Sequence, residues 1–398
     1  MIDLCAGGIF SAMFGDDAPE IWRRIGGVAT SSKNREFCSY SSHRQNYWRD
    51  KYIGMLKELT GFESVALFTT GSEATEAFWR CCRVFNGKPG VWGGLVDPDE
   101  VGGEKPLCDA MHGWTLGAMI MGGKLTWTEL GVFPELGESR FGRSAEATSC
   151  MIMEPYHAPS GQFHKIEPTI NRIMSRRKEF PDILFCMDEI QGGFGRTGKL
   201  WAHEHYQGGG KFLLSPDFIT FGKLCGGGLP LSALLGPKEI MESEVVIEGA
   251  HLHSTHSGNP LMCAVGCTVI EEMQKQRLIE RSAELGGKMH EKIKELPIHV
   301  HGKGLLAGFE MQNPDEVKEV THKCLSRGVQ VCDTGRKWVK IGPALNIEEG
   351  DLIDGISILM EVVEEVVNAR QKETEVSPCG DSGEGSQTVD SGLPQPGI

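Results

Sequence analysis

Short apolar runs alternate with longer stretches of helical character through the first two thirds of the chain. Four runs have the length and side chains of buried strands: VALFTT (65–70), CMIMEP (150–155), ILFCMDEI (183–190) and FITFG (218–222). The first leads through a Gly-Ser turn into the helical stretch EATEAFWRCCRVF. Strands that alternate with helices are typical of α/β domains with a largely parallel sheet, so we predict this architecture for residues 48–257.

The pattern changes near Pro260. A long helical stretch leads into IHVHG, LLAGFEM, VQVCD and WVKIGP, which are short and strand-like. Apolar positions then recur at helical spacing and predict a closing helix through Leu352, Ile356, Leu359, Val363 and Val366. We therefore expect a smaller α+β domain at residues 258–368. Residues 1–47 are expected to pack with it or to lie across the larger domain.

The composition changes again in residues 369–398, which are rich in Gly, Ser, Pro and acidic residues and contain few large apolar side chains. Such a segment cannot bury enough surface to offset the entropy lost on ordering. We predict a disordered tail.

The formal net charge of −14 argues against a nucleic-acid or anionic membrane partner, because a phosphate surface requires a basic face. No apolar run approaches the roughly 18 residues of a membrane span, and the start of the chain, MIDLCAGGIF, lacks the positive charge of a secretory signal. The 13 cysteines include no C-x-x-C pair, which favours reduced thiols over a disulfide framework. These features predict a cytoplasmic protein.

Polar residues stand where the predicted strands end. In open α/β sheets, ligands bind beyond the carboxyl ends of the strands. Gly71 and Ser72 open a helix and could offer amides and a hydroxyl to a phosphate, although a simple helix cap also explains the serine. Asp188 ends an apolar run and needs a cationic or donor partner when desolvated, although capping a neighbouring loop would satisfy it equally.

Lys223 follows a strand-like run and precedes three consecutive glycines. A buried lysine loses part of its preference for the charged form, and the neutral amine is a nucleophile toward carbonyls. Lys223 could therefore hold an aldehyde as a Schiff base. The alternative is a surface lysine at a strand end.

Two other motifs fit their usual chemistry poorly. Residues 193–198 match G-x-G-x-x-G, but the following KLWAHEHYQGGGK interrupts the helix that a dinucleotide site requires. His251, His253 and His256 lack the helical spacing and the nearby carboxylates of a metal site. We predict no bound nicotinamide and no metal.

In their order along the chain, several motifs together resemble the class III aminotransferases, which are pyridoxal-phosphate enzymes of fold type I. The matching pieces are GSEATEA, AMHGWT, MIMEP, DEIQGGFGRTG, DFITFGKLCGGGLPLSAL and THSGNPL. The resemblance implies a large domain with a mostly parallel seven-stranded sheet, bound pyridoxal 5'-phosphate, and a homodimer with active sites between the subunits.

The resemblance also implies roles for individual residues. Lys223 matches the lysine that forms the Schiff base with the cofactor and moves the proton, and Asp188 matches the partner of the pyridine nitrogen. An anion at that position keeps the ring nitrogen protonated, which strengthens the ring as an electron acceptor. Gln191 matches the partner of the ring oxygen, and Ile190 matches a residue packed on one ring face. The other implied cofactor contacts are Gly71 and Ser72 at the phosphate, Thr255 from the neighbouring subunit, Met111, His112 and Glu154.

Three positions depart from the family pattern. Met111 replaces an aromatic residue that stacks on the cofactor ring, and methionine is softer and less rigid. Pro159 stands where ornithine- and GABA-type members have a glutamate switch. Lys340 stands where they have an arginine for the substrate carboxylate, and an ammonium lacks the bidentate fork of a guanidinium.

We therefore expect an aminotransferase that moves an amino group from an amine or amino acid to a carbonyl acceptor in two half-reactions. Two alternatives remain open. One is a decarboxylase, racemase or aminomutase on the same fold, because the orientation of the substrate selects the bond that breaks. The other is a cofactor-binding homologue with impaired catalysis.

Overall fold

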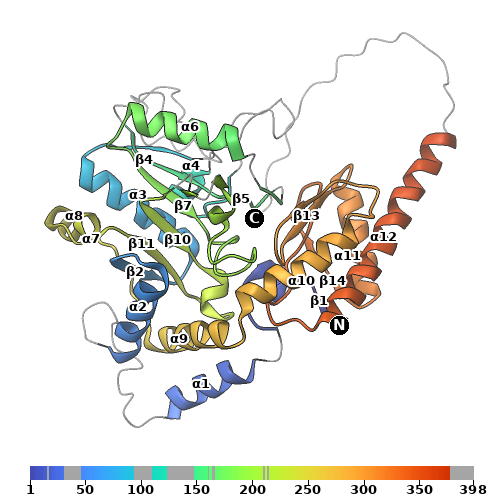
Figure 1. The fold of residues 1–398 in the computed structure, drawn as a ribbon, viewed down its shortest axis with the longest axis horizontal. Coiled ribbons are helices and arrows are strands. Elements are labelled where there is room, and N and C mark those ends of the chain that lie inside the picture. Colours follow the sequence, from blue (N-terminus) through green and yellow to red (C-terminus); the bar gives the residue numbers. More distant parts are fainter. Residues whose placement is uncertain are drawn as a thin grey trace, which may run out of the picture.

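The computed structural model describes residues 1–15, 18–30, 46–93, 110–122, 148–159, 161–163, 166–208, 211–212 and 215–376. A larger part, which contains the central six-stranded sheet, lies beside a smaller part that includes the last helix of the chain (Figure 1). Among the described helices, none combines the length and the apolar character that crossing a membrane requires.

A central sheet organises the larger part. Its order is β2 (Ser64–Phe68), β11 (Ser232–Gly236), β10 (Phe218–Phe221), β7 (Leu184–Asp188), β4 (Thr148–Met153) and β3 (Gly90–Trp92). Pairing is parallel from β10 through β7 and β4 to β3, and β11 is antiparallel to both of its neighbours. The expected mostly parallel sheet is confirmed. Six strands of this sheet lie within the described residues, and no seventh strand pairs with it there.

Both faces of this sheet are buried, which explains the continuous apolar runs in the sequence. Side chains of one strand point alternately to opposite faces, so Phe185 and Met187 join a different core cluster from Cys186. The Cys186 face is covered by α3 (Gly71–Asn86), and the opposite face by α2 (Tyr47–Thr60), α6 (Ile166–Glu179) and α9 (Pro260–Lys275).

Shorter elements complete the larger part. The helical ones are α4 (Leu116–Met121), α7 (Lys238–Met241), α8 (Glu244–Gly249) and the single turns η6 (Ala202–His205) and η7 (Lys223–Gly226). Two small hairpins pair β5 (Tyr156–His157) with β6 (Gln162–Phe163) and β8 (Gln207–Gly208) with β9 (Lys211–Phe212).

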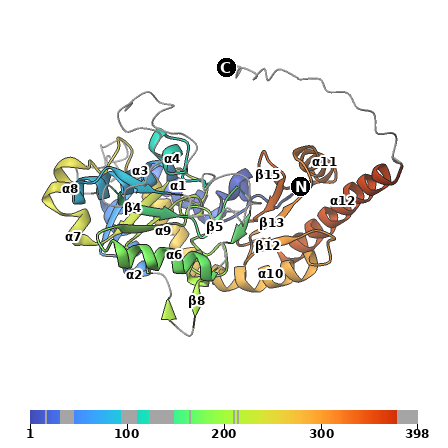
Figure 2. The same ribbon diagram turned by 90° about the horizontal axis from the view of Figure 1, so that it is seen from above.

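The smaller part contains a four-stranded antiparallel sheet. Its order is β12 (Val300–Gly302), β13 (Ala307–Glu310), β16 (Trp338–Ile341) and β15 (Cys332–Asp333). The helices α10 (Leu278–Ile293), α11 (Pro314–Ser326) and α12 (Glu349–Val376) are grouped around it (Figure 2). An α+β arrangement was expected for this part of the chain.

The closing helix α12 continues to Val376, past the expected domain end at residue 368. Residues 369–376 have the sequence ARQKETEV. Arg, Gln, Lys and Glu have good helix propensity, and adding residues to a helix that has already formed is favourable. The first residues of the predicted tail are therefore helical. Residues 377–398 lie outside the described part of the chain.

The first residues of the chain contact both parts. Strand β1 (Ile2–Asp3) pairs in parallel with β14 (Val329–Gln330) in the smaller part. An irregular turn at Ala6–Phe10 follows, and then α1 (Pro19–Thr30), which packs against α9 of the larger part. The described residues 1–15 and 18–30 thus contact both parts of the molecule.

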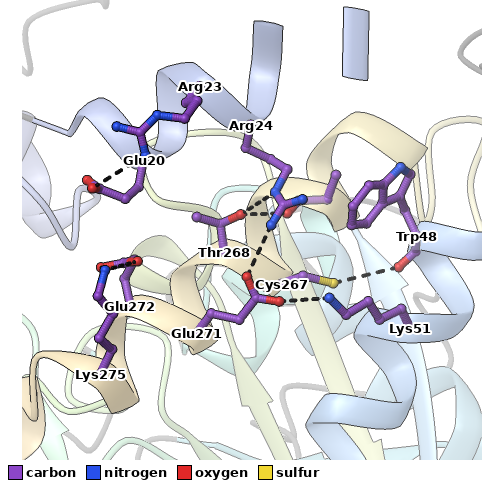
Figure 3. A network of polar contacts seen from close by, with 11 residues as sticks. Glu20, Arg23, Arg24, Trp48, Lys51, Cys267, Thr268, Glu271, Glu272 and Lys275 are labelled. Atoms are coloured by element: carbon purple, nitrogen blue, oxygen red, sulfur yellow. Dashed lines mark hydrogen bonds and ion pairs between the residues drawn. The ribbon is translucent and has the colours of Figure 1, made fainter. Parts of the chain in front are cut away.

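A polar network holds α1 on the larger part (Figure 3). Arg24 of α1 donates to Thr268 Oγ1 at 2.7 Å and to Glu271 Oε2 at 3.1 Å, both on α9. Lys51 of α2 donates to Glu271 Oε1 at 2.7 Å, and the Arg24 guanidinium lies 4.9 Å from the ring centroid of Trp48. Glu271 therefore joins three helices.

Close backbone contact joins the two parts of the molecule. Gly286 of α10 packs on the backbone of Gly304, so a Cβ at Gly286 would lie far inside van der Waals distance of backbone atoms. Gly304 itself has φ +54° and packs on Thr197 and Gly198 of the larger part. Small residues at both positions permit this approach.

We predict that Gly286→Ala lowers the free energy of unfolding by about 1–3 kcal/mol, because the backbone of Gly304 must shift to admit the methyl group. The matched control is Gly287→Ala, which adds a methyl group with no atom within 4 Å and removes a flexible residue from a helix. It should raise the free energy of unfolding by about 0.5–1 kcal/mol. Thermal unfolding midpoints measure both, and equal midpoints would contradict the contact.

Candidate active site

The two ionisable residues singled out at strand ends lie at one edge of the central sheet. Asp188 is the last residue of β7, and Lys223 follows the end of β10 after Gly222. These strands are neighbours and run parallel, with Thr220 opposite Asp188 in the register. The carboxylate and the amine therefore meet at the carboxyl edge, where α/β sheets bind ligands.

Asp188 is 3% exposed and is held by two hydrogen bonds. His112 Nδ1 lies 2.7 Å from Oδ2, and the backbone N–H of Ile190 donates to Oδ1 at 3.1 Å. An ionised carboxylate only accepts, so His112 carries its proton on Nδ1. The carbonyl of His112 accepts from Thr75 Oγ1 at 2.8 Å, which ties the segment to α3. The contact fixes Asp188 in one orientation.

Lys223 has φ +50°, a left-handed conformation that costs energy for a residue with a side chain. Lys223 as a whole is partly exposed, but its amine is surrounded by protein. This burial lowers the pKa of the amine. The carboxylates of Asp188 and Glu154 oppose that shift. The amine therefore loses its proton more readily than an exposed lysine while it remains attracted to a negative site.

Glu154 follows β4 and is buried beside the same group of charges. Burial raises the pKa of its carboxyl, and the neighbouring His112 opposes the shift. Its Oε1 accepts from the backbone N–H of Met111 at 3.1 Å. Glu154 thus fixes the backbone of the segment that carries Met111 and His112.

The N-terminus of α3 faces this cluster. Thr70 and Glu73 form a capping box, and Ser72 Oγ accepts from the backbone N–H of Trp114 at 3.1 Å. A Cβ on Gly71 would lie 2.6 Å from Ile190 Cδ1, so glycine permits the close approach of α3 to the segment after β7. Anions are stabilised at such helix ends by amide groups and the helix dipole.

Gly113 shows the same close packing from the other side. It has φ +133°, and a Cβ there would overlap Ser72. The candidate site is therefore surrounded by three segments: residues 111–114, the start of α3 and the segment after β7. Seven of the candidate residues are gathered by these contacts: Gly71, Ser72, Met111, His112, Glu154, Asp188 and Ile190.

Lys340 and Gln191 meet at this place from opposite parts of the molecule. Lys340, on β16, donates to Gln191 Oε1 at 3.0 Å and to the carbonyl of Ala158 at 2.6 Å. Burial lowers the pKa of Lys340 to about 8. Pro159 directly follows Ala158, whose carbonyl Lys340 contacts.

Thr255 follows Ser254, whose side chain hydrogen-bonds Glu73 at the start of α3. Thr255 is exposed in the loop between α8 and α9, where Ser254 N–H donates to Ser257 Oγ at 2.6 Å. A cavity of about 390 Å³ adjoins this loop, lined in part by His253, Ser257 and Leu67.

Two neighbours of the site were not found from the sequence. Cys332 lies opposite Lys340 in the β15–β16 register, and burial raises the pKa of its thiol. Phe10, at φ +57°, places its ring centroid 5.2 Å from Lys340 Nζ. Both are far from the site in the sequence and belong to no motif, so only strand pairing and chain packing reveal them.

Comparisons with known proteins agree on one family. The family model "Aminotransferase class-III" matches residues 134–363, more than half of the chain. An acetylornithine aminotransferase of Aquifex aeolicus is 34% identical over 219 residues, 55% of this chain and 54% of that protein. A leucine/methionine racemase of Thermococcus litoralis is 33% identical over 241 residues, 57% of this chain and 52% of that protein. The chain thus aligns with about half the length of each of these relatives.

A solved structure extends the similarity over most of the chain. The acetylornithine aminotransferase of Elizabethkingia anophelis superposes with a TM-score of 0.69 and 25% identity, over 91% of this chain and 89% of that one. The agreement includes both the larger and the smaller part.

We predict that the Lys223 amine becomes reactive at a lower pH than an exposed lysine, because burial lowers its pKa. Reductive methylation with formaldehyde from neutral pH to about pH 10, followed by peptide mass spectrometry, measures the pH of half-maximal labelling. The control is Lys238, whose side chain is 64% exposed. Half-maximal labelling of Lys223 at or above the pH found for Lys238 would contradict the desolvation argument.

Proposed function

The chain belongs to the class III aminotransferase family, and from that premise we propose that it transfers an amino group from an amine or amino acid to a keto or aldehyde acceptor. The observation that carries the proposal is the meeting of Lys223 with Asp188 at the ends of adjacent parallel strands. An amine of lowered pKa beside a fixed carboxylate suits a group that alternately holds and releases a proton.

We propose pyridoxal 5'-phosphate as the cofactor, because the residues present suit its separate groups. The first amides of α3, at Gly71 and Ser72, suit the phosphate, since the capping box leaves them free of partners among the described residues. Asp188, held by His112, suits the protonated ring nitrogen, and the Lys223 amine suits the aldehyde. When bound, the cofactor supplies a ring that accepts the electron pair left at the substrate carbon.

The chain's own residues then orient and move protons. Lys223 Nζ takes the proton from the substrate carbon and returns one, which its lowered pKa favours. Ile190 is positioned by the tight packing on Gly71 and would form an apolar wall beside the ring. His112 and the Ile190 amide hold the Asp188 carboxylate in place.

Acetylornithine is the substrate that the names of the aminotransferase relatives suggest, and we propose amino acids and related amines as the donor class. The racemase relative supports a second candidate activity, the interconversion of amino acid enantiomers at the same site. Incubation of single enantiomers with and without a keto acid separates the two. Transamination requires the acceptor and forms a new amino acid, whereas racemisation requires no acceptor.

We also propose a homodimer in which Thr255 of each subunit completes the phosphate site of the other. Thr255 is exposed in the single chain, and the cavity beside its loop leaves the same face unfilled. A phosphate bound by the first amides of α3 has further oxygen atoms that could accept a hydrogen bond from the Thr255 hydroxyl.

Lys223→Ala should abolish the covalent attachment of pyridoxal phosphate and reduce turnover by orders of magnitude, because no other amine replaces it at the end of β10. The measurement is the visible absorption band of protein loaded with the cofactor and its loss on borohydride reduction. Lys238→Ala is the control for removal of a lysine at an exposed site. A borohydride-sensitive band of normal size in the Lys223 variant would refute the assignment.

Asp188→Asn keeps the shape of the side chain but removes its charge, so the ring nitrogen loses the anion that holds its proton. We expect kcat to fall by about a hundredfold or more, the size seen when one preorganised electrostatic contact is lost. Asp182→Asn, at an exposed carboxylate, is the control. Kinetics close to wild type in the Asp188 variant would count against this role.

Complementation tests the proposed dimer. Lys223→Ala and Thr255→Asp should each be inactive as pure proteins, the second because a carboxylate repels the phosphate. Mixed dimers formed by refolding the two together should regain activity, since one of the two sites then combines an intact Lys223 with an intact Thr255. No recovery in mixtures shown by mass to contain mixed dimers would contradict the shared site.

A further inference from the structure

Lys340 is a buried ammonium that reaches from the smaller part into the larger one. It lies on β16 and is 4% exposed. Its Nζ donates to the Ala158 carbonyl at 2.6 Å and to Gln191 Oε1 at 3.0 Å. Both acceptors belong to the larger part, one after β5 and one after β7. The contacts tie the two parts together beside the candidate site.

The direction of these hydrogen bonds determines how Gln191 is oriented. An ammonium has three N–H donors and no acceptor, so only the oxygen of the Gln191 amide can face Lys340. The amide NH2 group must then point away from Lys340. Among the described residues this NH2 group has no hydrogen-bond partner, which leaves both of its N–H groups for a ligand.

The surroundings of Lys340 leave little freedom for another arrangement. The Phe10 ring centroid lies 5.2 Å from Nζ and presents a π-face to the cation. Gly161 encloses the side-chain stem, because a Cβ there would lie 3.5 Å from Lys340 Cδ and 2.9 Å from the backbone of Gly308. With two carbonyl-type acceptors and one ring, the ammonium has a partner for each donor.

The charges near Lys340 belong to the same site. Lys223 disfavours its charged form, while Glu154 favours it. Burial is the largest influence and lowers the pKa of Lys340 to about 8, so the ammonium form prevails at neutral pH. A charged donor next to the Gln191 oxygen polarises the amide and strengthens its N–H groups as donors.

We propose that Lys340 is a positioning residue that acts through Gln191: it fixes the amide so that its NH2 group donates to the ring oxygen of the bound cofactor. The inference rests on the proposed function, since it requires pyridoxal phosphate at this site. It assigns Lys340 a task other than binding the substrate carboxylate, because two of its three N–H donors already bind Ala158 and Gln191. It also links the position of the smaller part to the ionisation of the cofactor.

A donor to the ring oxygen stabilises the oxygen anion over its protonated form. Lys340→Met should therefore raise the pH at which the absorption spectrum of the bound cofactor changes. A tenfold weaker preference for the anionic form of the ring oxygen corresponds to a rise of about one pH unit. Lys340→Arg retains a cationic donor and should stay closer to wild type. Lys337→Met, which removes a half-exposed lysine beside β16, is the matched control and should leave the spectrum unchanged.

A double-mutant cycle separates action through Gln191 from a direct effect of the charge. The spectral transition is measured in wild type, Lys340→Met, Gln191→Leu and the double variant. If Lys340 acts through Gln191, Lys340→Met adds no shift once Gln191 is replaced. Equal shifts in both backgrounds would overturn the proposal. If Lys340→Met does not fold, Lys340→Gln takes its place in the cycle.

Steady-state kinetics provide a second readout. We expect Lys340→Met to change kcat to a similar extent for donors with and without a carboxylate, because its effect lies on the cofactor. A selective rise in KM for carboxylate-bearing donors, with an unchanged spectrum, would show that Lys340 binds substrate and would overturn the proposal. A wild-type protein that develops no visible band with pyridoxal phosphate would instead refute the proposed function itself.

Discussion

Desolvation of a few charges at the carboxyl edge of the central sheet is the constraint on which the site depends. Lys223, Asp188 and Glu154 lie where the sheet is covered on both faces, so water cannot solvate them fully. Each must find partners in the protein. Burial lowers the pKa of Lys223, and the attraction between its amine and the two carboxylates limits this decrease. An amine of lowered pKa beside carboxylates is suited to proton transfer.

The partners of these charges come from segments that are distant in the sequence. His112 donates to Asp188, Glu154 accepts from the amide of Met111, and Lys340 donates to Gln191. Each of these contacts also fixes a stretch of chain between elements, because the residues that it joins lie on, before or after different strands and helices. The electrostatic requirement of the site therefore also orders the chain around it.

Close glycine contacts bring the pieces within reach of one another. Gly71 and Gly113 allow the start of α3 to approach the loops that carry Ile190 and His112. Gly286 allows α10 to approach the backbone of Gly304, and Gly304 in turn packs on Thr197 and Gly198 of the larger part. Side chains at these positions would separate elements that carry the site. Glycine at these positions is thus needed for the close approach of neighbouring segments as well as for backbone conformation.

The amino-acid sequence by itself determined the buried strands, the helices between them and the polar residues at the strand ends, because apolar periodicity and turn chemistry are local properties. Strands β4, β7 and β10 were found in this way, and with them the positions of Asp188 and Lys223. Helix α12 extends beyond its expected end because favourable propensity in its last turns outweighs their polar composition. Only the tertiary structure decided that Lys340 donates to Gln191, that His112 holds Asp188, and that Phe10 and Cys332 lie beside the site. These pairings depend on strand order and on how two parts of the chain pack, and no local pattern encodes a contact between residues 149 positions apart.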